Sequence, residues 1–255
     1  MVITLGNIVF GGKGNGGGAP AAYVVPDGMS FARSSLTEFP SSAFDFSQKT
    51  NFDHCWEECS SLTEFPLINT ANGTNFNYAW YNCNKLTSFP ALDLSSCNSF
   101  GSAWGFCQSL KEFPLIDTSK GTDFAFAWAY CSSLTEFPAL DLSSSSGYFY
   151  GTWSNCSSLI TIPQLDLSSG INFSGAWDNC SALTTLGGFG AIKADIDLSS
   201  STKLTVESLM NVITQAADLN ELGLTGKTMN FGSTNLAKLT DEQKAVATNK
   251  GWTLA

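Results

Sequence analysis

Tryptophan recurs at a nearly constant interval through the middle of this chain. The intervals are 24, 24, 24, 25 and 24 residues, and the series is Trp56, Trp80, Trp104, Trp128, Trp153 and Trp177. A phenylalanine precedes each tryptophan by four residues, a cysteine follows it by three, and a leucine follows that cysteine by three. Periods of about 20–50 residues indicate stacked repeats, because one such unit cannot bury its own apolar side. The repeat therefore predicts a solenoid.

Each unit has the pattern Phe-x-x-Ala-Trp-x-x-Cys-x-x-Leu-x-x-Phe-Pro-x-Leu-Asp-x-Ser-Ser. From Phe76, the apolar residues Ala79, Trp80 and Cys83 have the spacing of a short helix, and the Ser-Ser pair ahead of it suits a helix N-cap. The Leu-Thr-Glu-Phe-Pro stretch predicts a short strand with inward phenylalanines. These are Phe89, Phe113 and Phe137. We predict an α/β repeat solenoid, with leucine-rich-repeat-like coils of about 24 residues stacked roughly 4.8 Å apart.

Two further rows recur once per coil. A proline follows each inward phenylalanine and is expected to end the strand, because it cannot donate to a hydrogen-bond ladder. An aspartate or asparagine follows and is expected to cap the next turn through its side chain. This row is Asp45, Asn69, Asp93, Asp117, Asp141 and Asp166.

From these motifs, residues 34–189 resemble the leucine-rich repeats of the BspA-like surface-protein family, in which Cys-x-x-Leu-x-x-Ile/Phe-Pro recurs with a downstream aromatic residue. The segments 204–213 and 236–252 resemble the carboxy-terminal part of BspA-like proteins from gut bacteria and their phages. The resemblance implies a surface-displayed role in adhesion or recognition. It does not identify what is recognised.

The two ends differ from the repeats. Residues 190–255 are predicted to cap the open core: Val206, Leu209 and Ile213 lie on one face of an amphipathic helix, and Thr240 with Gln243 forms a capping box for a second helix. Residues 1–33 contain a short β-like run to Phe10 and then a glycine-rich linker. This segment is either an anchor that adds a strand to a virion or surface protein, or a disordered terminus.

Charge excludes one class of partner. The chain has a formal net charge of −10. The whole of that charge lies between Ser34 and Leu186, which hold 14 Asp/Glu and 4 Lys. This block would repel phosphate backbones, so we expect no nucleic-acid partner. The apolar runs are shorter than the roughly 18 residues that span a membrane, and the amino terminus lacks the basic residues of a secretory signal.

We expect no metal site and no cofactor. Six cysteines recur in register with parallel side chains, too far apart for the usual disulfide geometry, and are predicted to be buried, reduced and apolar in character. His54, Cys55 and Cys59 could form part of a zinc site, but a second ligand pair is absent from the sequence nearby. The glycine run near Gly14 lacks the Lys-Ser/Thr ending of a phosphate-binding loop.

We also expect no enzymatic activity. The chain has one histidine and one arginine, which removes most catalytic triads and acid–base pairs. Glu57 with Glu58, or the recurring glutamates, could supply paired carboxylates for glycoside cleavage. Repeated acidic residues on a solenoid are more often a solvated face.

Two surface rows are candidate binding sites. The aromatic row flanks the Ala-Trp motif and varies between coils, in the mixture of Tyr, Ser, Gly and Asn that is typical of adaptable binding surfaces. Its members are Tyr78, Tyr81, Phe106, Phe126, Tyr130, Tyr148 and Tyr150. Alternatively, these rings pack against the helices or against another subunit of a homo-oligomer. The acidic row comprises Glu64, Glu112 and Glu136, and is either a solvated face or a site for a cation or basic partner.

These observations predict a non-enzymatic, displayed binding module. The favoured form is a phage virion accessory or host-attachment protein that recognises a bacterial surface glycan or protein, held through residues 1–33. A bacterial cell-surface adhesin is one alternative. A structural protein that decorates a capsid or tail is another, and it predicts that the aromatic row is buried between subunits.

Overall fold

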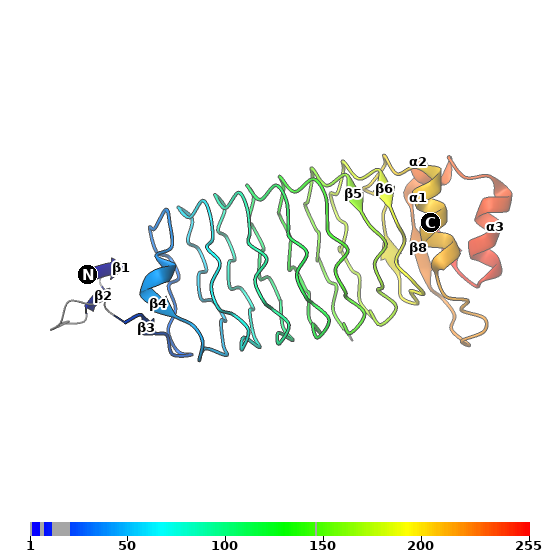
Figure 1. Ribbon diagram of the computed structural model, residues 1–255. Coiled ribbons are helices and arrows are strands. Elements are labelled where there is room, and N and C mark those ends of the chain that lie inside the picture. The colour runs from blue at the N-terminus through cyan, green and yellow to red at the C-terminus, as the bar shows by residue number, and fades with distance from the viewer. Residues whose placement is uncertain (1, 6–7, 12–20, 146) are drawn as a thin grey trace.

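The computed structural model describes residues 2–5, 8–11, 21–145 and 147–255. Successive 24-residue segments form coils that lie side by side in one elongated stack, and three helices lie together at its C-terminal end (Figure 1). Parallel bridges hold neighbouring coils in register. They join residues 51, 75, 99, 123, 148 and 172 in that order.

The Phe-x-x-Ala-Trp-x-x-Cys segment of each coil forms what we call the turn ladder, which comprises residues 52–59, 76–83, 100–107, 124–131, 149–156 and 173–180. Within it, alternate N–H groups follow two different routes. Phe76, Tyr78, Trp80 and Asn82 donate to carbonyls of the next coil at 2.7–2.9 Å. The N–H groups of residues 79, 81 and 83 close turns onto the carbonyl three residues earlier. The peptide groups that bridge coils therefore all point the same way along the stack.

The short helix predicted in each coil is wrong. Among the described residues between 46 and 205, the chain forms no helix. An α-helix needs every N–H to bond four residues back and every φ to be negative, whereas Tyr78 has φ 53° and Asn82 has φ 57°. The predicted serine N-caps are also wrong, since Ser95 donates its backbone N–H and Oγ to Asp93 at 3.1 and 2.7 Å.

This last contact recurs, and it confirms the capping role predicted for the aspartate row. Asp117, Asp141 and Asp166 accept the N–H of the residue two positions on, at 3.0–3.1 Å. The predicted strands are short: β5 (Thr161–Ile162) and β6 (Thr185–Leu186) are parallel and contain two residues each. In the earlier coils the same stretch forms only isolated bridges, such as Glu64 to Ser88.

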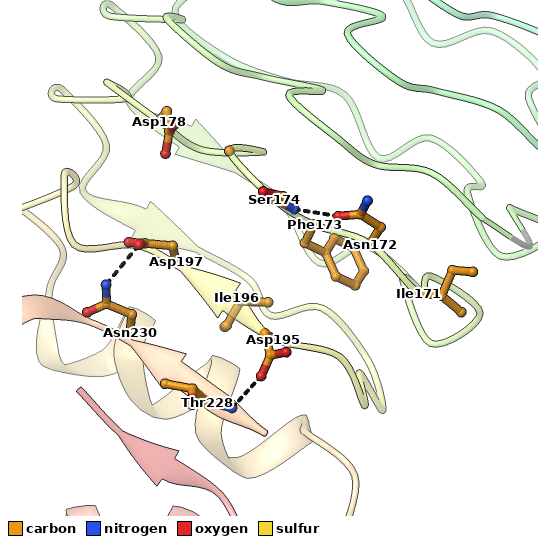
Figure 2. A pocket seen from close by; sticks show the side chains of 11 residues that line it. Ile171, Asn172, Phe173, Ser174, Asp178, Asp195, Ile196, Asp197, Thr228 and Asn230 are labelled. Carbon is orange, nitrogen blue, oxygen red and sulfur yellow. Dashed lines mark hydrogen bonds between the residues drawn. The ribbon is translucent and has the colours of Figure 1, made fainter. Parts of the chain in front are cut away.

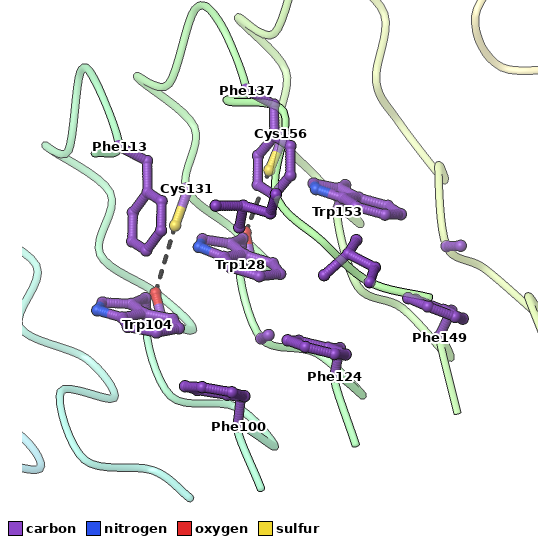
Figure 3. Close-up of a cluster of buried hydrophobic side chains, with 14 of the residues drawn as sticks. Phe100, Trp104, Phe113, Phe124, Trp128, Cys131, Phe137, Phe149, Trp153 and Cys156 are labelled. Atoms are coloured by element: carbon purple, nitrogen blue, oxygen red, sulfur yellow. Dashed lines mark hydrogen bonds between the residues drawn. The ribbon is translucent and has the colours of Figure 1, made fainter. Parts of the chain in front are cut away.

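Columns of aromatic rings fill the stack. The Trp104 ring centroid lies 5.5 Å from that of Trp80 and 5.4 Å from that of Trp128, with planes within 7°. Phe113 stands nearly perpendicular to Trp104, at 4.8 Å (Figure 3). Phe89, Phe113 and Phe137 are buried, as predicted. Close packing of identical rings at one coil spacing fixes the register of the stack.

The stack begins before residue 34, contrary to the predicted boundary. Strand β3 (Tyr23–Val24) pairs in parallel with β4 (Phe44–Asp45), which follows the 3₁₀ turn η1 (Ser41–Ala43). Phe31 takes the place of a tryptophan and stacks on Trp56 at 6.2 Å. Buried Lys49 closes this end by donating its Nζ to three backbone carbonyls at 2.9–3.0 Å.

Residues 2–5 and 8–11 form two strands. Strand β1 (Val2–Leu5) pairs antiparallel with β2 (Ile8–Gly11), so the apolar run forms a hairpin. A hairpin satisfies part of its own backbone hydrogen bonding, unlike the single strand that we predicted. The glycine-rich linker at 12–18 lies outside the described residues, and the anchor hypothesis for residues 1–33 stays a prediction.

The C-terminal region combines helices with a small parallel sheet. The sheet has the order β7 (Ile196–Asp197), β8 (Thr228–Asn230), β9 (Thr253–Leu254). The helices are α1 (Val206–Gln215), α2 (Gly232–Leu236) and α3 (Asp241–Asn249). The predicted capping box between Thr240 and Gln243 is present. No helix in the described part of the chain is long and apolar enough to cross a membrane.

Candidate functional site

The predicted aromatic row lies on the outer side of the turn ladder. Tyr78, Phe126 and Tyr130 are 38–39% exposed, and Tyr150 is 43% exposed. Tyr81 and Phe106 are half-buried between them. These are large fractions for aromatic side chains, whose burial otherwise stabilises a protein. Packing against a helix layer, one of the alternatives for this row, does not occur because the described residues of the coils between 46 and 205 form no helix.

The rings contact one another across coils. His54 stacks on Tyr78 at 4.7 Å, and Tyr78 meets Tyr81 edge to face at 5.4 Å. Tyr81 meets Phe106 at 5.3 Å, and Phe106 stacks on Tyr130 at 4.2 Å. Five rings thus form a continuous surface over four coils.

A second group lies on the same ladder. Phe126 and Tyr150 meet edge to face at 4.8 Å. We call both groups together the aromatic patch; its members are His54, Tyr78, Tyr81, Phe106, Phe126, Tyr130 and Tyr150. Tyr148 is 55% exposed nearby and has no ring contact among the described residues.

Four members of the patch adopt a strained backbone conformation. Tyr78, Phe106, Phe126 and Tyr130 have φ between 53° and 62°. A fifth member, His54, has φ 52° but belongs to a residue type that tolerates this region better. This region suits glycine and asparagine and costs a bulky residue about 1–2 kcal/mol. Other coils place glycine, asparagine, Ser102 or Glu58 at these two positions, and Ser102 and Glu58 also have left-handed φ. Gly151 and Gly175 align with Phe126, and Asn82, Asn155 and Asn179 align with Tyr130. The chain therefore retains exposed aromatic rings where its own repeat offers unstrained residues, and such strain often marks a functional site.

Glycines in the next coil make room for two of the rings. A Cβ on Gly151 would lie 2.4 Å from the Phe126 ring, and a Cβ on Gly105 would lie 3.1 Å from the Tyr81 ring. These rings therefore lean over the neighbouring backbone. The two rings therefore lie close against the stack, and the neighbouring coils hold them in position.

Charged groups border one end of the patch. His54 Nδ1 lies 3.1 Å from a Glu57 carboxylate oxygen, and Arg33 pairs with Glu58 at 3.0 Å. Burial, with smaller contributions from Tyr78 and the two glutamates, raises the pKa of Tyr81. The Tyr81 phenol therefore stays protonated at neutral pH and can donate a hydrogen bond.

The acidic row lies on another part of each coil. Glu64, Glu112 and Glu136 are exposed, and Glu64 and Glu136 form bridges to Ser88 and Thr161 on the strand side. The aromatic patch lies instead on the turn ladder. Glu112 and Glu136 occupy adjacent coils, and no ion pair involves either one among the described residues. The structure therefore does not combine the two predicted rows into one site.

The cysteines form an inner row of donors. All eight are buried with free thiols. Cys107 Sγ donates to the Trp80 carbonyl of the preceding coil at 3.3 Å, and Cys131 donates to Trp104 at the same distance. Burial raises the pKa of Cys107 to about 12. The described residues contain no group of three or more His, Cys, Asp or Glu side chains suited to a metal.

Sequence reasoning missed two features of this site. His54 was considered only as a metal ligand, although it forms one end of the aromatic surface. The left-handed backbone was also missed. Its signal in the sequence is that two fixed positions of the repeat carry glycine or asparagine in some coils and an aromatic residue in others. Comparison with family models, curated proteins and solved structures finds no match for this chain.

Proposed function

We propose that this protein is a non-enzymatic binding module whose aromatic patch recognises a glycan on a bacterial surface. The proposal places it on a phage particle, with display on a bacterial cell as the alternative. The observation that carries it is the set of exposed, mutually contacting rings held on strained backbone. Neither core packing nor backbone preference accounts for those rings.

The geometry of the patch suits a saccharide chain. Flat aromatic faces bind the apolar C–H faces of sugar rings while neighbouring hydroxyl, amide and carboxylate groups bind the sugar hydroxyls. Tyr78, Tyr81 and Tyr130 supply phenol groups, and Glu57 and His54 lie at one end. Five rings over four coils extend along one direction, as a linear polymer does. A rigid stack loses little conformational entropy when such a ligand binds.

The repeat itself supplies the test. Tyr78→Ser and Tyr130→Asn place at each site the residue that another coil already carries there, Ser102 and Asn82 respectively. Each change removes ring contacts, and Tyr130→Asn also relieves backbone strain, while Ser102 shows that the repeat accommodates serine at the Tyr78 position with φ 55°. We therefore expect the free energy of unfolding to change by less than about 1 kcal/mol. We expect the double variant to bind bacterial polysaccharides on an array at least about tenfold more weakly, a loss of about 1.4 kcal/mol.

A matched control is Thr135→Ser, an exposed change on the strand side of the same coils. It should leave binding unchanged. If the double variant binds as well as the native protein, or the native protein binds no saccharide, the proposal fails. Loss of assembly into particles without any loss of saccharide binding would favour the structural role instead.

A further inference from the structure

The turn ladder ends in an open cleft beside the C-terminal sheet. The cleft has a volume of about 520 Å³. One wall is the last coil, at residues 171–175 with Asp178. The other wall is formed by Asp195 and strand β7, with Thr228 and Asn230 of β8. Figure 2 shows the two walls facing each other. The cleft is separate from the aromatic patch, which ends one coil earlier.

Backbone N–H groups on the first wall lack the acceptors that the equivalent groups have in the preceding coil. In the preceding coil, Phe149, Gly151 and Trp153 donate their N–H groups to carbonyls of residues 172, 174 and 176, at 2.9–3.0 Å. The equivalent N–H groups of Phe173, Gly175 and Trp177 have no acceptor among the described residues. Only Asn179 finds a substitute, the Ser200 hydroxyl at 3.0 Å.

The cause is the path of the chain after the last coil. Strand β7 does not return over residues 173–177, because it pairs with β8 through Ile196 and Met229. The ladder therefore stops where a seventh set of carbonyl groups would lie. Phe173 is 1% exposed as a residue, and its N–H has no acceptor among the described residues. The open row is a template for further backbone pairing.

The cleft also has a distinct charge. Asp178 lies on the first wall, with its carboxylate 3.1 Å from the position of a Cβ on Gly175. Asp195 and Asp197 lie on the opposite wall. Lys227 Nζ lies 3.8 Å from an Asp195 carboxylate oxygen. Asp195 accepts the Thr228 N–H at 2.7 Å and Asp197 accepts a hydrogen bond from Asn230 Nδ2 at 2.8 Å, but neither donor is charged. The three carboxylates around this open cleft therefore still favour a cationic ligand.

We propose that this cleft binds an extended peptide segment that carries a lysine or arginine. Its carbonyl groups, two residues apart, accept the N–H groups of Phe173 and Gly175 as the carbonyls of a next coil would. Its cationic side chain lies against Asp195 and Asp197. The same ladder already binds a row of peptide carbonyls five times in this molecule, which favours a peptide over a saccharide at this position.

The experiment is a titration of the ¹⁵N-labelled protein with two peptides, acetyl-Gly-Ala-Lys-Ala-Gly-amide and the same peptide with glutamate at its centre. We expect the amide proton resonances of Phe173 and Gly175 to move downfield and saturate with the lysine peptide only. The double variant Asp195→Asn, Asp197→Asn should weaken that binding about tenfold.

Asp141→Asn is the control for the loss of the turn bonds. Asp141 and Asp197 each accept a serine N–H and a serine hydroxyl, but Asp197 also accepts a hydrogen bond from Asn230 Nδ2 at 2.8 Å and lines the cleft. The proposal is overturned if the lysine peptide leaves Gly175 unmoved, if the glutamate peptide acts equally, or if Asp141→Asn weakens binding as much. Shifts caused by chitotetraose, or by raising the protein concentration alone, would assign the cleft to a saccharide or to a second copy and would also overturn it.

Discussion

Raising the pH above 9 is expected to unfold this protein over a narrow range. Burial raises the pKa of several thiols above the value of 9.0 that they have when exposed, to about 12 for Cys55, Cys97, Cys107 and Cys180. It also raises the pKa of Cys131 and Cys156. Above pH 9 the unfolded chain releases these protons and the folded chain keeps them. The associated stability is complete below pH 9 and is lost as the pH rises toward 12.

The expected slope is large because the cysteines act together. Each buried thiol contributes about 1.4 kcal/mol per pH unit in this range. Six thiols in coils that unfold together would give about 8 kcal/mol per pH unit. Urea denaturation between pH 8 and 11, with a reductant present, measures the slope.

Cys107→Ala provides the control for this prediction. The variant loses the bond to the Trp80 carbonyl and is expected to be less stable at pH 8. Its slope above pH 9 should nevertheless be shallower than that of the native protein by about 1.4 kcal/mol per pH unit. Equal slopes for the two proteins would show that thiol ionisation does not drive the transition.

Trp104→Ala is expected to destabilise the protein by about 3–5 kcal/mol, the usual cost of removing a fully buried aromatic side chain. Trp104 is inaccessible to solvent and lies in the middle of the stack, between two tryptophans at 5.4–5.5 Å. The vacated space cannot close without shifting the register of both neighbouring coils. Thermal or urea unfolding monitored by circular dichroism measures the loss.

Trp104→Phe separates volume from ring stacking. Among the described residues, the Trp104 Nε1 group has no hydrogen-bond partner, so phenylalanine leaves no acceptor unpaired. We expect this variant to lose less than half as much stability as Trp104→Ala. If both variants cost the same, stacking within the column contributes little. A cost below 1 kcal/mol for Trp104→Ala would contradict the packing of the core.

The sequence predicted much of the arrangement inside the coils. The period located the tryptophan and cysteine columns, and the phenylalanines before each proline point inward as expected. The aspartate row caps the turns for the predicted reason, and the capping box at Thr240 is present. These features depend on contacts that recur at one interval or on bonds between close neighbours, both of which are visible in a single sequence.

The local conformation of the repeat was wrong. Ala79, Trp80 and Cys83 have helical spacing, but the segment forms turns with left-handed residues. Apolar spacing cannot distinguish these structures, because both direct every third or fourth side chain to one side. The choice between helix and turns depends on the hydrogen bonds that alternate N–H groups form with the next coil. Those bonds exist only when the coils are stacked.

For the candidate sites, too, some features follow from the sequence and others only from the tertiary structure. By itself, the sequence determined the period, the inward residues, the acidic balance and the list of variable aromatic positions, since each follows from residue type and spacing. Only the tertiary structure decided that His54 joins those rings and that four of them stand on strained backbone. It alone decided that the acidic row lies elsewhere and that the ladder ends in free donors. Those features depend on which coil lies next to which, and on where the last coil has no neighbour.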